Sequence, residues 1–194
     1  VEMLEEEPVQ APVIENIERK KENKNPPLLY NLAELQNDCS KFFKISPDQT
    51  LQVVQELYEK KMVTYPRTDA RVLSTAVAKE IYKNISGLKN YSICSAFASE
   101  ILEQGSYKGI AKTRYVNDKQ ITDHYAIIPT GQGLNNLNSL NPTAAKVYET
   151  ICRRFLSIFY PPAVYQKVAI TTGIKSEKFF SNFKVLSEEG YLKV

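Results

Sequence analysis

Apolar residues change their spacing twice along the chain. Residues 12–27 show no helical repeat and read as one extended segment that ends on a pair of prolines. From Leu28 to about Phe159, apolar residues recur at the three- and four-residue spacing of amphipathic helices. After a second pair of prolines the spacing becomes two, which predicts two or three strands broken near Gly173 and Gly190.

Residues 46–61, SPDQTLQVVQELYEKK, carry the clearest helix signal. Ser46 stands at the N-cap, a proline occupies the first helical position, and Gln49 completes a capping box. The side chains expected on the inner face are Leu51, Val54, Leu57 and Tyr58. This helix leads directly into the sequence MVTYPRTD at residues 62–69.

Two further helices are predicted over residues 74–85 and 141–159. The second begins with Asn141 as its cap and a proline in the first turn, and its apolar residues repeat at helical spacing. Arg153 and Arg154 fall towards its polar face. We expect these two arginines to form a solvated basic pair.

The order of strand, helices and strands predicts an α+β fold, with a mainly helical domain inserted into a small antiparallel β domain. Residues 1–27 and 161–194 would form the β domain, and residues 28–160 the helical domain. Pairing of the first strand with the last ones is also expected to place the two chain ends together.

Composition narrows the class of protein. A chain of 194 residues with 43% hydrophobic content suits an ordinary globular protein. No stretch approaches the roughly 18 continuous apolar residues of a membrane span, and the first residues are acidic rather than signal-like. The three cysteines are far apart, so neither a disulfide nor a zinc site is expected. We therefore expect a soluble, cytoplasmic monomer.

Charge is unevenly distributed. Residues 1–27 hold seven acidic and four basic side chains, a net charge of −3, whereas residues 28–194 hold 15 acidic and 21 basic ones, a net charge of +6. The basic part could face a polyanion such as DNA, although this balance is also common in proteins that bind no nucleic acid.

The sequence TYPRTD at residues 64–69 contains a candidate nucleophile. Pro66 biases Tyr65 towards an extended backbone, in which Tyr65 and Arg67 share a face. A phenol, with an ordinary pKa near 10, needs a cation or a base to act as a nucleophile, and a guanidinium can clamp two phosphate oxygens. The alternative is a half-buried tyrosine in a proline turn, with Arg67 and Asp69 forming a local ion pair.

Three segments, in the same order, resemble type IA DNA topoisomerases of the topoisomerase III branch. Residues 60–74, KKMVTYPRTDARVLS, are similar to the segment that carries the family's catalytic tyrosine. Residues 26–36, PPLLYNLAELQ, resemble the start of the tyrosine-bearing domain, and residues 121–131, ITDHYAIIPTG, resemble an H-x-A-I-x-P motif. The resemblance implies that Tyr65 cuts one DNA strand, holds its 5′ phosphate while another strand passes, and reseals it without ATP.

The resemblance also implies roles for other residues. Arg67 and His124 would contact the reacting phosphate, and a nearby carboxylate could raise the pKa of the histidine. The expected supporting residues are Thr68, Asp69 and Asp123. Tyr125 stands where such enzymes often have a second histidine. Without the resemblance, a lone histidine before an apolar run is more often structural.

Candidate contacts to the phosphates of single-stranded DNA flank the tyrosine. These are Lys60, Lys61 and Arg71. It is equally plausible that these residues are exposed charges that keep the protein soluble and do not contact DNA. Nothing in the chain resembles the toprim domain, whose acidic residues bind Mg²⁺ in this family. The resemblance therefore implies a fragment that holds no metal, does not relax DNA alone, and belongs to a nucleoid-associated enzyme.

Two other functions compete with this hypothesis. A non-catalytic DNA-binding module on the same scaffold would bind DNA in a salt-dependent way without a covalent product. Another tyrosine-based strand transferase, such as a recombinase or relaxase, would require a different arrangement of arginine and histidine, and the chain has only one histidine.

Overall fold

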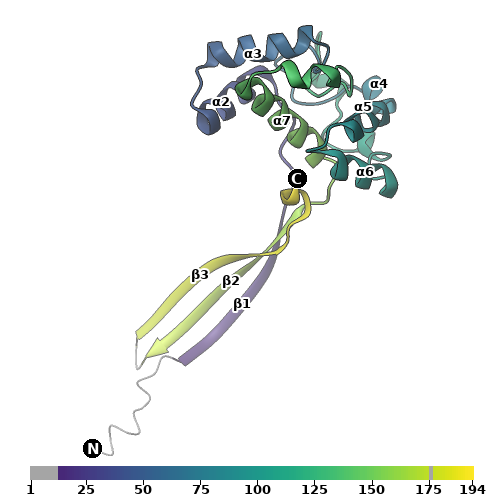
Figure 1. Cartoon of the computed structure of the whole chain (residues 1–194). Helices are drawn as coiled ribbons and strands as arrows, with labels where there is room; N and C mark the ends of the chain where they lie inside the picture. Colours follow the sequence, from purple (N-terminus) through teal and green to yellow (C-terminus); the bar gives the residue numbers. More distant parts are fainter. Residues whose placement is uncertain (1–12, 175–176) are drawn as a thin grey trace, which may run out of the picture. The chain divides into compact units, whose positions relative to one another are not determined.

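A computed structural model describes residues 13–174 and 177–194 (Figure 1). The chain divides into two compact units, one ending at Asn25 and resuming over Pro162–Lys193, the other formed by Pro26–Pro161. The first unit contains an antiparallel sheet and the second is mainly helical, which confirms a mixed fold of helices and a small sheet. The first 12 residues of the expected β domain lie outside the described residues.

The sheet has three strands in the order β1-β2-β3, and both neighbouring pairs are antiparallel. Its strands are β1 (Val13–Lys24), β2 (Ala163–Ile174) and β3 (Glu177–Glu188), followed by a short 3₁₀ helix, η6 (Gly190–Lys193). Val13 pairs with Gly173, whereas Glu188 pairs with Val164. The start of β1 and the end of β3 therefore lie at opposite ends of the sheet. The third strand reverses the direction in which the chain leaves the sheet. Residues 1–12 lie outside the described residues, so the expectation that the two chain ends lie together stays a prediction.

Two capped helices begin the helical unit. In α2 (Leu32–Phe43) the Asn31 side chain accepts a hydrogen bond from the Glu34 amide at 2.8 Å, and α3 (Pro47–Glu59) begins with the predicted capping box of Ser46 and Gln49. The buried stripe of α3 consists of Thr50, Val54 and Leu57. Tyr58, expected on the inner face, lies at the edge of this stripe with 39% of its surface exposed.

The helix predicted over residues 74–85 is two helices, α4 (Thr75–Lys79) and α5 (Ile81–Gly87). The break occurs at Glu80, whose backbone (φ −111°, ψ 12°) is not helical. Separate contacts hold the two helices. The Asp118 carboxylate accepts hydrogen bonds from the Thr75 amide at 2.8 Å and hydroxyl at 2.7 Å, whereas Gly87 packs against Gly131 so closely that an added Cβ would lie 2.2 Å from its carbonyl oxygen.

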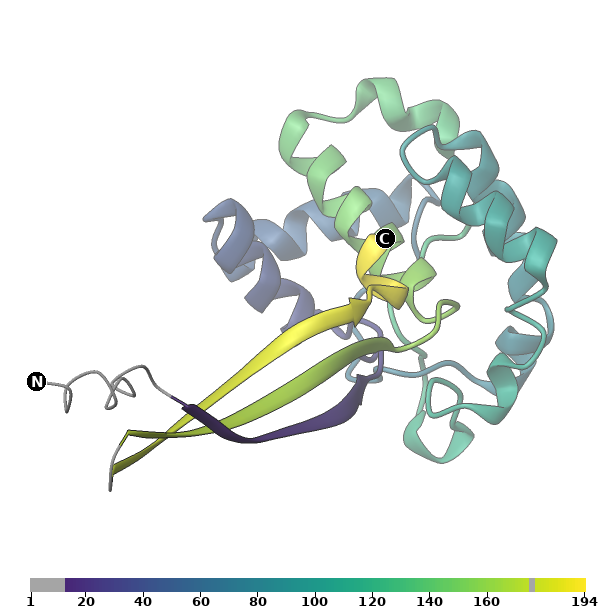
Figure 2. The same ribbon diagram turned by 90° about the horizontal axis from the view of Figure 1, so that it is seen from below.

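The long helix α7 (Pro142–Ser157) begins with the predicted Asn141 cap and supplies much of the core. It lies between the α2 and α3 pair and the group of α4, α5 and α6 (Ser95–Gln104) in Figures 1 and 2. Among its fully buried side chains are Tyr148, Ile151, Cys152 and Phe155. The remaining short 3₁₀ helices are η2 (Leu88–Asn90), η3 (Ile110–Lys112), η4 (Asp118–Gln120) and η5 (Leu134–Ser139).

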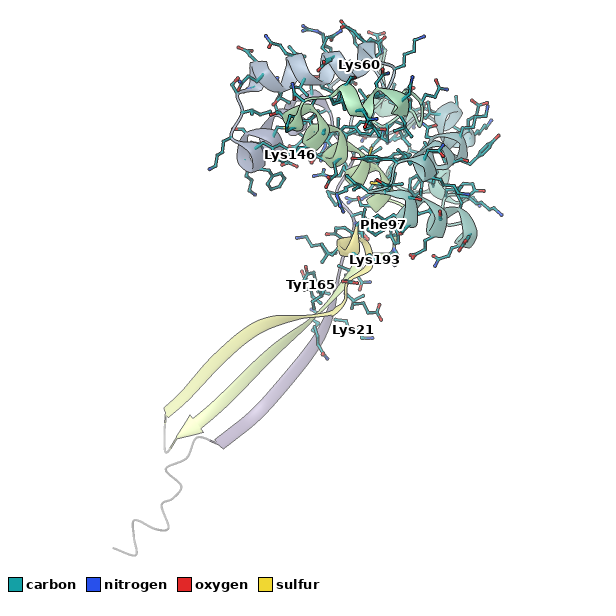
Figure 3. All side chains as sticks on the ribbon, in the orientation of Figure 1. Lys21, Lys60, Phe97, Lys146, Tyr165 and Lys193 are labelled. Atoms are coloured by element: carbon teal, nitrogen blue, oxygen red, sulfur yellow. The ribbon has the colours of Figure 1, made fainter. Side chains whose placement is uncertain are left out.

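Figure 3 shows the side chains of the helical unit, in which Lys60 marks the end of α3 and Lys146 the first turns of α7. The three cysteines are free and buried, and burial raises the pKa of the Cys39 and Cys94 thiols to about 11. Within the described ranges, every helix is too short or too polar to cross a membrane.

Candidate active site

The segment that carries Tyr65 begins where α3 ends. The amides of Lys61 and Met62 donate to the carbonyls of Tyr58 and Leu57, both at 2.9 Å, which is the hydrogen-bond pattern of a Schellman motif. Lys61 occupies the left-handed position of this motif with φ 63°, a conformation that is most often adopted by glycine. This tight stop turns the chain out of the helix and into the tyrosine segment.

Hydrogen bonds to residues 126–130 then align the segment with the sequence around His124. The Thr64 amide donates to the Ile128 carbonyl, and the Thr64 hydroxyl accepts from the Ile128 amide and donates to the Ala126 carbonyl, each at 3.0 Å. On the other side of Val63, the Thr130 amide donates to the Met62 carbonyl at 2.9 Å. Thr64 is therefore the residue that joins the two motif segments most directly.

The third motif segment closes this frame. The Leu29 amide donates to the Arg71 carbonyl and the Leu32 amide to the Thr68 carbonyl, each at 3.1 Å. The Ile127 amide donates to the Tyr30 carbonyl at 2.8 Å. The three segments that carry the family resemblance, far apart in sequence, therefore share one backbone hydrogen-bond network around Tyr65.

Two aromatic rings contact the half-buried side chain of Tyr65. The imidazole of His124 stacks on the phenol ring, with centroids 4.2 Å apart and planes inclined by 29°. Tyr58 meets the phenol ring edge to face at 5.4 Å. Within the described part of the chain, the Tyr65 hydroxyl has no hydrogen-bond partner, so it is available to a substrate.

Arg67 lies at a tight turn rather than in an extended strand. The Thr68 amide donates to the Pro66 carbonyl at 3.0 Å, which makes a three-residue turn centred on Arg67. The alternation that would place Tyr65 and Arg67 on one face therefore does not apply. Arg67 is exposed, and its guanidinium forms no ion pair or hydrogen bond with any described residue, Asp69 included.

The expected supporting residues fall into two groups. Thr68 is buried, and its hydroxyl donates to the His124 carbonyl at 3.4 Å and accepts from the Ala70 amide at 3.1 Å, so it braces the loop. Asp69 and Asp123 are exposed, and neither carboxylate bonds to the His124 ring within the described residues.

The three candidate DNA contacts differ in their surroundings. Lys60 pairs with Glu56 at 3.3 Å and also lies 3.4 Å from the Ser139 hydroxyl. Lys61 is exposed, and its ammonium has no ion-pair partner among the described residues. Arg71 is half-buried, and its guanidinium donates to the carbonyls of Leu29 at 3.1 Å and Leu28 at 3.4 Å, which uses part of its hydrogen-bonding capacity. Contact of these residues with DNA stays a prediction.

An open hollow of about 610 Å³ lies beside Tyr65. A smaller recess of about 70 Å³ adjoins Tyr65 and His124. The hollow is lined by Tyr58, Glu59, Lys61, Val63, Thr64, Tyr65, His124, Tyr125, Thr130 and Gln132. Burial raises the pKa of the Tyr125 phenol, so its hydroxyl keeps its proton at neutral pH.

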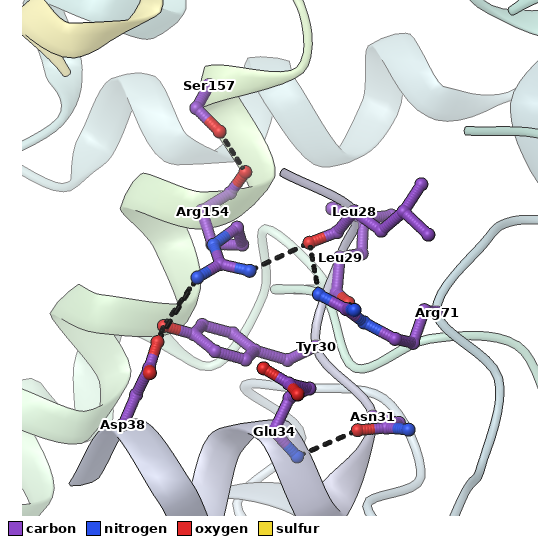
Figure 4. Close-up of polar contacts among 9 residues, drawn as sticks. All are labelled: Leu28, Leu29, Tyr30, Asn31, Glu34, Asp38, Arg71, Arg154 and Ser157. Atoms are coloured by element: carbon purple, nitrogen blue, oxygen red, sulfur yellow. Dashed lines mark hydrogen bonds and ion pairs between the residues drawn. The ribbon is translucent and has the colours of Figure 1, made fainter. Parts of the chain in front are cut away.

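Arg154 belongs to a partly buried cluster, the Arg154 cluster, that consists of Leu28, Tyr30, Asp38 and Arg154 (Figure 4). Its guanidinium donates to the Asp38 carboxylate at 3.1 Å and the Leu28 carbonyl at 2.8 Å, and lies 4.2 Å from the centre of the Tyr30 ring. The Tyr30 hydroxyl donates to the same carboxylate at 2.5 Å. The expectation of a solvated pair is therefore wrong for Arg154. Arg153 is partly exposed and pairs with Glu149.

Comparison with known proteins identifies the family. Residues 2–194 match a protein-family model described as DNA topoisomerase. The chain therefore belongs to the DNA topoisomerase family, which confirms the resemblance to type IA enzymes carried by the three motif segments. Among its relatives are two proteins named DNA topoisomerase 3. That of Bacillus subtilis is 36% identical over 187 residues, and that of a Bacillus cereus strain is 33% identical over 188 residues.

These alignments cover 94% and 95% of this chain but only 24% and 25% of the two relatives. The chain thus spans about a quarter of the length of the curated relatives it matches. A solved structure of full-length topoisomerase I from Thermotoga maritima shares the fold, with a TM-score of 0.65 and 22% identity. That match covers 100% of this chain and 31% of the Thermotoga protein.

Proposed function

We propose that this chain is the tyrosine-bearing portion of a type IA DNA topoisomerase that cuts one DNA strand, lets another pass, and reseals the cut without ATP. The observation that carries the proposal is the backbone network that brings residues 26–36, 60–74 and 121–131 together around Tyr65. A protein that only bound DNA would need no phenol whose hydroxyl has no partner among the described residues, stacked on an imidazole and two positions from an exposed arginine.

In the proposed reaction, Tyr65 attacks a phosphodiester of single-stranded DNA. A bond forms between the phenol oxygen and phosphorus, and the bond between phosphorus and the 3′ oxygen breaks. The released strand end takes up a proton as a 3′-hydroxyl, and resealing reverses these steps. Arg67, which has no carboxylate partner among the described residues, would offer two donors to the phosphate oxygens, and His124 would donate a further hydrogen bond beside the phenol.

We also propose that Mg²⁺ is bound by a toprim domain of a longer protein. The described side chains do not fit such a role, because among them there is no group of three or more His, Cys, Asp or Glu that could hold a metal ion. On this proposal the 194-residue chain alone does not relax DNA.

The proposed arrangement is a helical domain, residues 28–160, inserted into a β domain of residues 1–27 and 161–194 that acts as its hinge. The division into compact units near residues 25 and 161 supports it. We further propose that the protein is a monomer that binds single-stranded DNA in the cytoplasm, associated with the nucleoid. The net charge of +6 over residues 28–194 supports DNA as the partner.

The test replaces the matching quarter of Bacillus subtilis DNA topoisomerase 3 with residues 2–194 of this chain. End-labelled single-stranded DNA and Mg²⁺ are added, and covalent adducts are resolved on a denaturing gel. We expect an adduct that disappears in Tyr65→Phe and persists in Tyr82→Phe, a control at an exposed tyrosine on α5. A folded chimera that binds DNA without forming an adduct would instead support the DNA-binding module. An adduct that survives in Tyr65→Phe would refute the assignment of the nucleophile.

A further inference from the structure

The hollow beside Tyr65 is larger than a phosphate group needs. Its volume of about 610 Å³ falls within the usual range of small-molecule sites, roughly 300–1,000 Å³. Besides Tyr65, it presents the rings of Tyr58 and Tyr125 and the polar side chains of Glu59, Lys61 and Gln132. Aromatic rings beside hydrogen-bonding groups are the surface on which nucleobases stack.

Most of the side chains that line the hollow can still contact a ligand. Tyr58 is 39% exposed, and its ring is in contact with the nucleophile. The side-chain amide of Gln132 and the Lys61 ammonium have no partner among the described residues. The backbone of Lys61 is nevertheless fixed, because its carbonyl accepts a hydrogen bond from the Thr130 hydroxyl at 2.6 Å.

We propose that this hollow binds the nucleotide on the 3′ side of the cut, the one whose 5′ phosphate becomes attached to Tyr65. The inference rests on the proposed function, because attachment to the phenol oxygen keeps that sugar and base within a few bonds of the ring. The base would pack against the exposed ring of Tyr58, and Gln132 would bond to its edge.

The charged side chains that line the hollow favour this placement of the base. The Glu59 carboxylate disfavours a phosphate beside it but accepts hydrogen bonds from the amino groups of bases. Lys61 supplies the cation for the next phosphate along the strand. The hollow therefore offers separate places for a base and for a phosphate.

The test uses the 194-residue chain and needs no strand cleavage. The probes are two 5′-phosphorylated hexathymidylates, one with the fluorescent base 2-aminopurine at the first position and the other with it at the sixth. Stacking on an aromatic ring quenches 2-aminopurine. We expect saturable quenching of the first position and little change at the sixth.

Substitutions at Tyr58 test whether this ring is the stacking surface. Tyr58→Ala should weaken binding of the first probe by about tenfold, the effect of losing one base–aromatic contact, and Tyr58→Phe should restore it. Tyr82→Ala is the matched control, because Tyr82 is a similarly exposed tyrosine, at 45%, outside the hollow. Circular dichroism of each variant checks that the helices are retained.

Lys61→Ala provides an independent measurement. It should weaken binding and lower the slope of log affinity against log salt by about 1, as expected for one lost phosphate contact. Equal quenching at both positions, or equal effects of Tyr58→Ala and Tyr82→Ala, would overturn the proposal for the hollow. The adduct assay on the chimera decides the assignment of Tyr65 separately, since binding of these probes involves no covalent step.

Discussion

Tyr30 and Tyr65 lie in the same helical unit, with Arg154 over the ring of Tyr30 and Arg67 two positions after Tyr65 in the chain, yet their polar groups are used in opposite ways. The hydroxyl of Tyr30 donates to Asp38, and the guanidinium of Arg154 bonds to that carboxylate. Around Tyr65, the phenol hydroxyl and the Arg67 guanidinium have no bonding partner within the described part of the chain.

The difference separates polar groups that stabilise the fold from those left for a ligand. In the Arg154 cluster, burial demands that every charge be paired, because an unpaired charge in a poorly solvated place is costly. At the Tyr65 site the backbone groups are hydrogen-bonded, whereas the Tyr65 hydroxyl and the Arg67 guanidinium have no partner among the described residues. Substitutions should therefore affect mainly stability in the first cluster and mainly chemistry in the second.

The largest expected loss of stability follows Arg154→Ala. The side chains of Arg154 and Asp38 are each only 16% exposed, so the substitution leaves a poorly solvated carboxylate without its cation. We expect the free energy of unfolding to fall by about 3 kcal/mol, as for a broken buried ion pair. Urea unfolding at 25 °C, followed by circular dichroism, measures it.

Arg153→Ala is the matched control. Arg153 forms an i,i+4 pair with Glu149, and both side chains are more than a third exposed. Its loss should cost less than about 0.5 kcal/mol. Equal destabilisation by the two variants would show that the Arg154 cluster contributes nothing beyond an ordinary surface pair.

Arg67→Ala should affect the reaction strongly and stability very little. Its guanidinium forms no hydrogen bond or ion pair with a described residue, so the free energy of unfolding should change by less than about 0.5 kcal/mol. In the chimera, the rate of adduct formation should fall by about 100-fold, the usual effect of removing a donor that stabilises developing charge. Arg67→Lys should recover only part of this loss, because an ammonium lacks the bidentate geometry.

A rate that is unchanged in Arg67→Ala would remove this residue from the reaction. A large fall in stability would show that Arg67 belongs with the structural arginines and that the contrast between the two clusters fails.

Local signals explain what the sequence could predict. The helix starts at Ser46 and Asn141 were predictable, because an N-cap and a proline at the first turn act within four residues. The short motif around Tyr65 also identified the family. These features depend on neighbours along the chain, so they can be recognised without knowledge of the fold.

Features that depend on distant residues were not predictable. The environment of Arg154 is set by Asp38, 116 positions earlier, and helical periodicity alone places this arginine on a polar face. The helix break at Glu80 coincides with tertiary contacts of α4 and α5 rather than with a proline or glycine. The bracing role of Thr64 likewise appears only when residues 126–130 lie beside it.

The sharpest test of the contrast is at Lys61, which combines a left-handed backbone conformation with an ammonium that has no partner among the described residues. At φ 63°, a residue with a side chain is strained and glycine is not. Lys61→Gly should therefore raise the free energy of unfolding by up to about 1 kcal/mol, measured by urea unfolding. The same variant should bind the phosphorylated hexanucleotide more weakly, since it lacks the ammonium.

Lys60→Gly controls for the removal of a lysine at the end of α3. Lys60 has φ −83°, where glycine relieves no strain, and its ammonium pairs with Glu56, so this variant should lose stability. Changes of opposite sign in the free energy of unfolding at these two adjacent lysines would show that the backbone of Lys61 has a conformation unfavourable for a residue with a side chain. If Lys61→Gly is destabilised as much as Lys60→Gly, the left-handed conformation of Lys61 is not strained. The backbone conformation would then give no support for a role of Lys61 in binding.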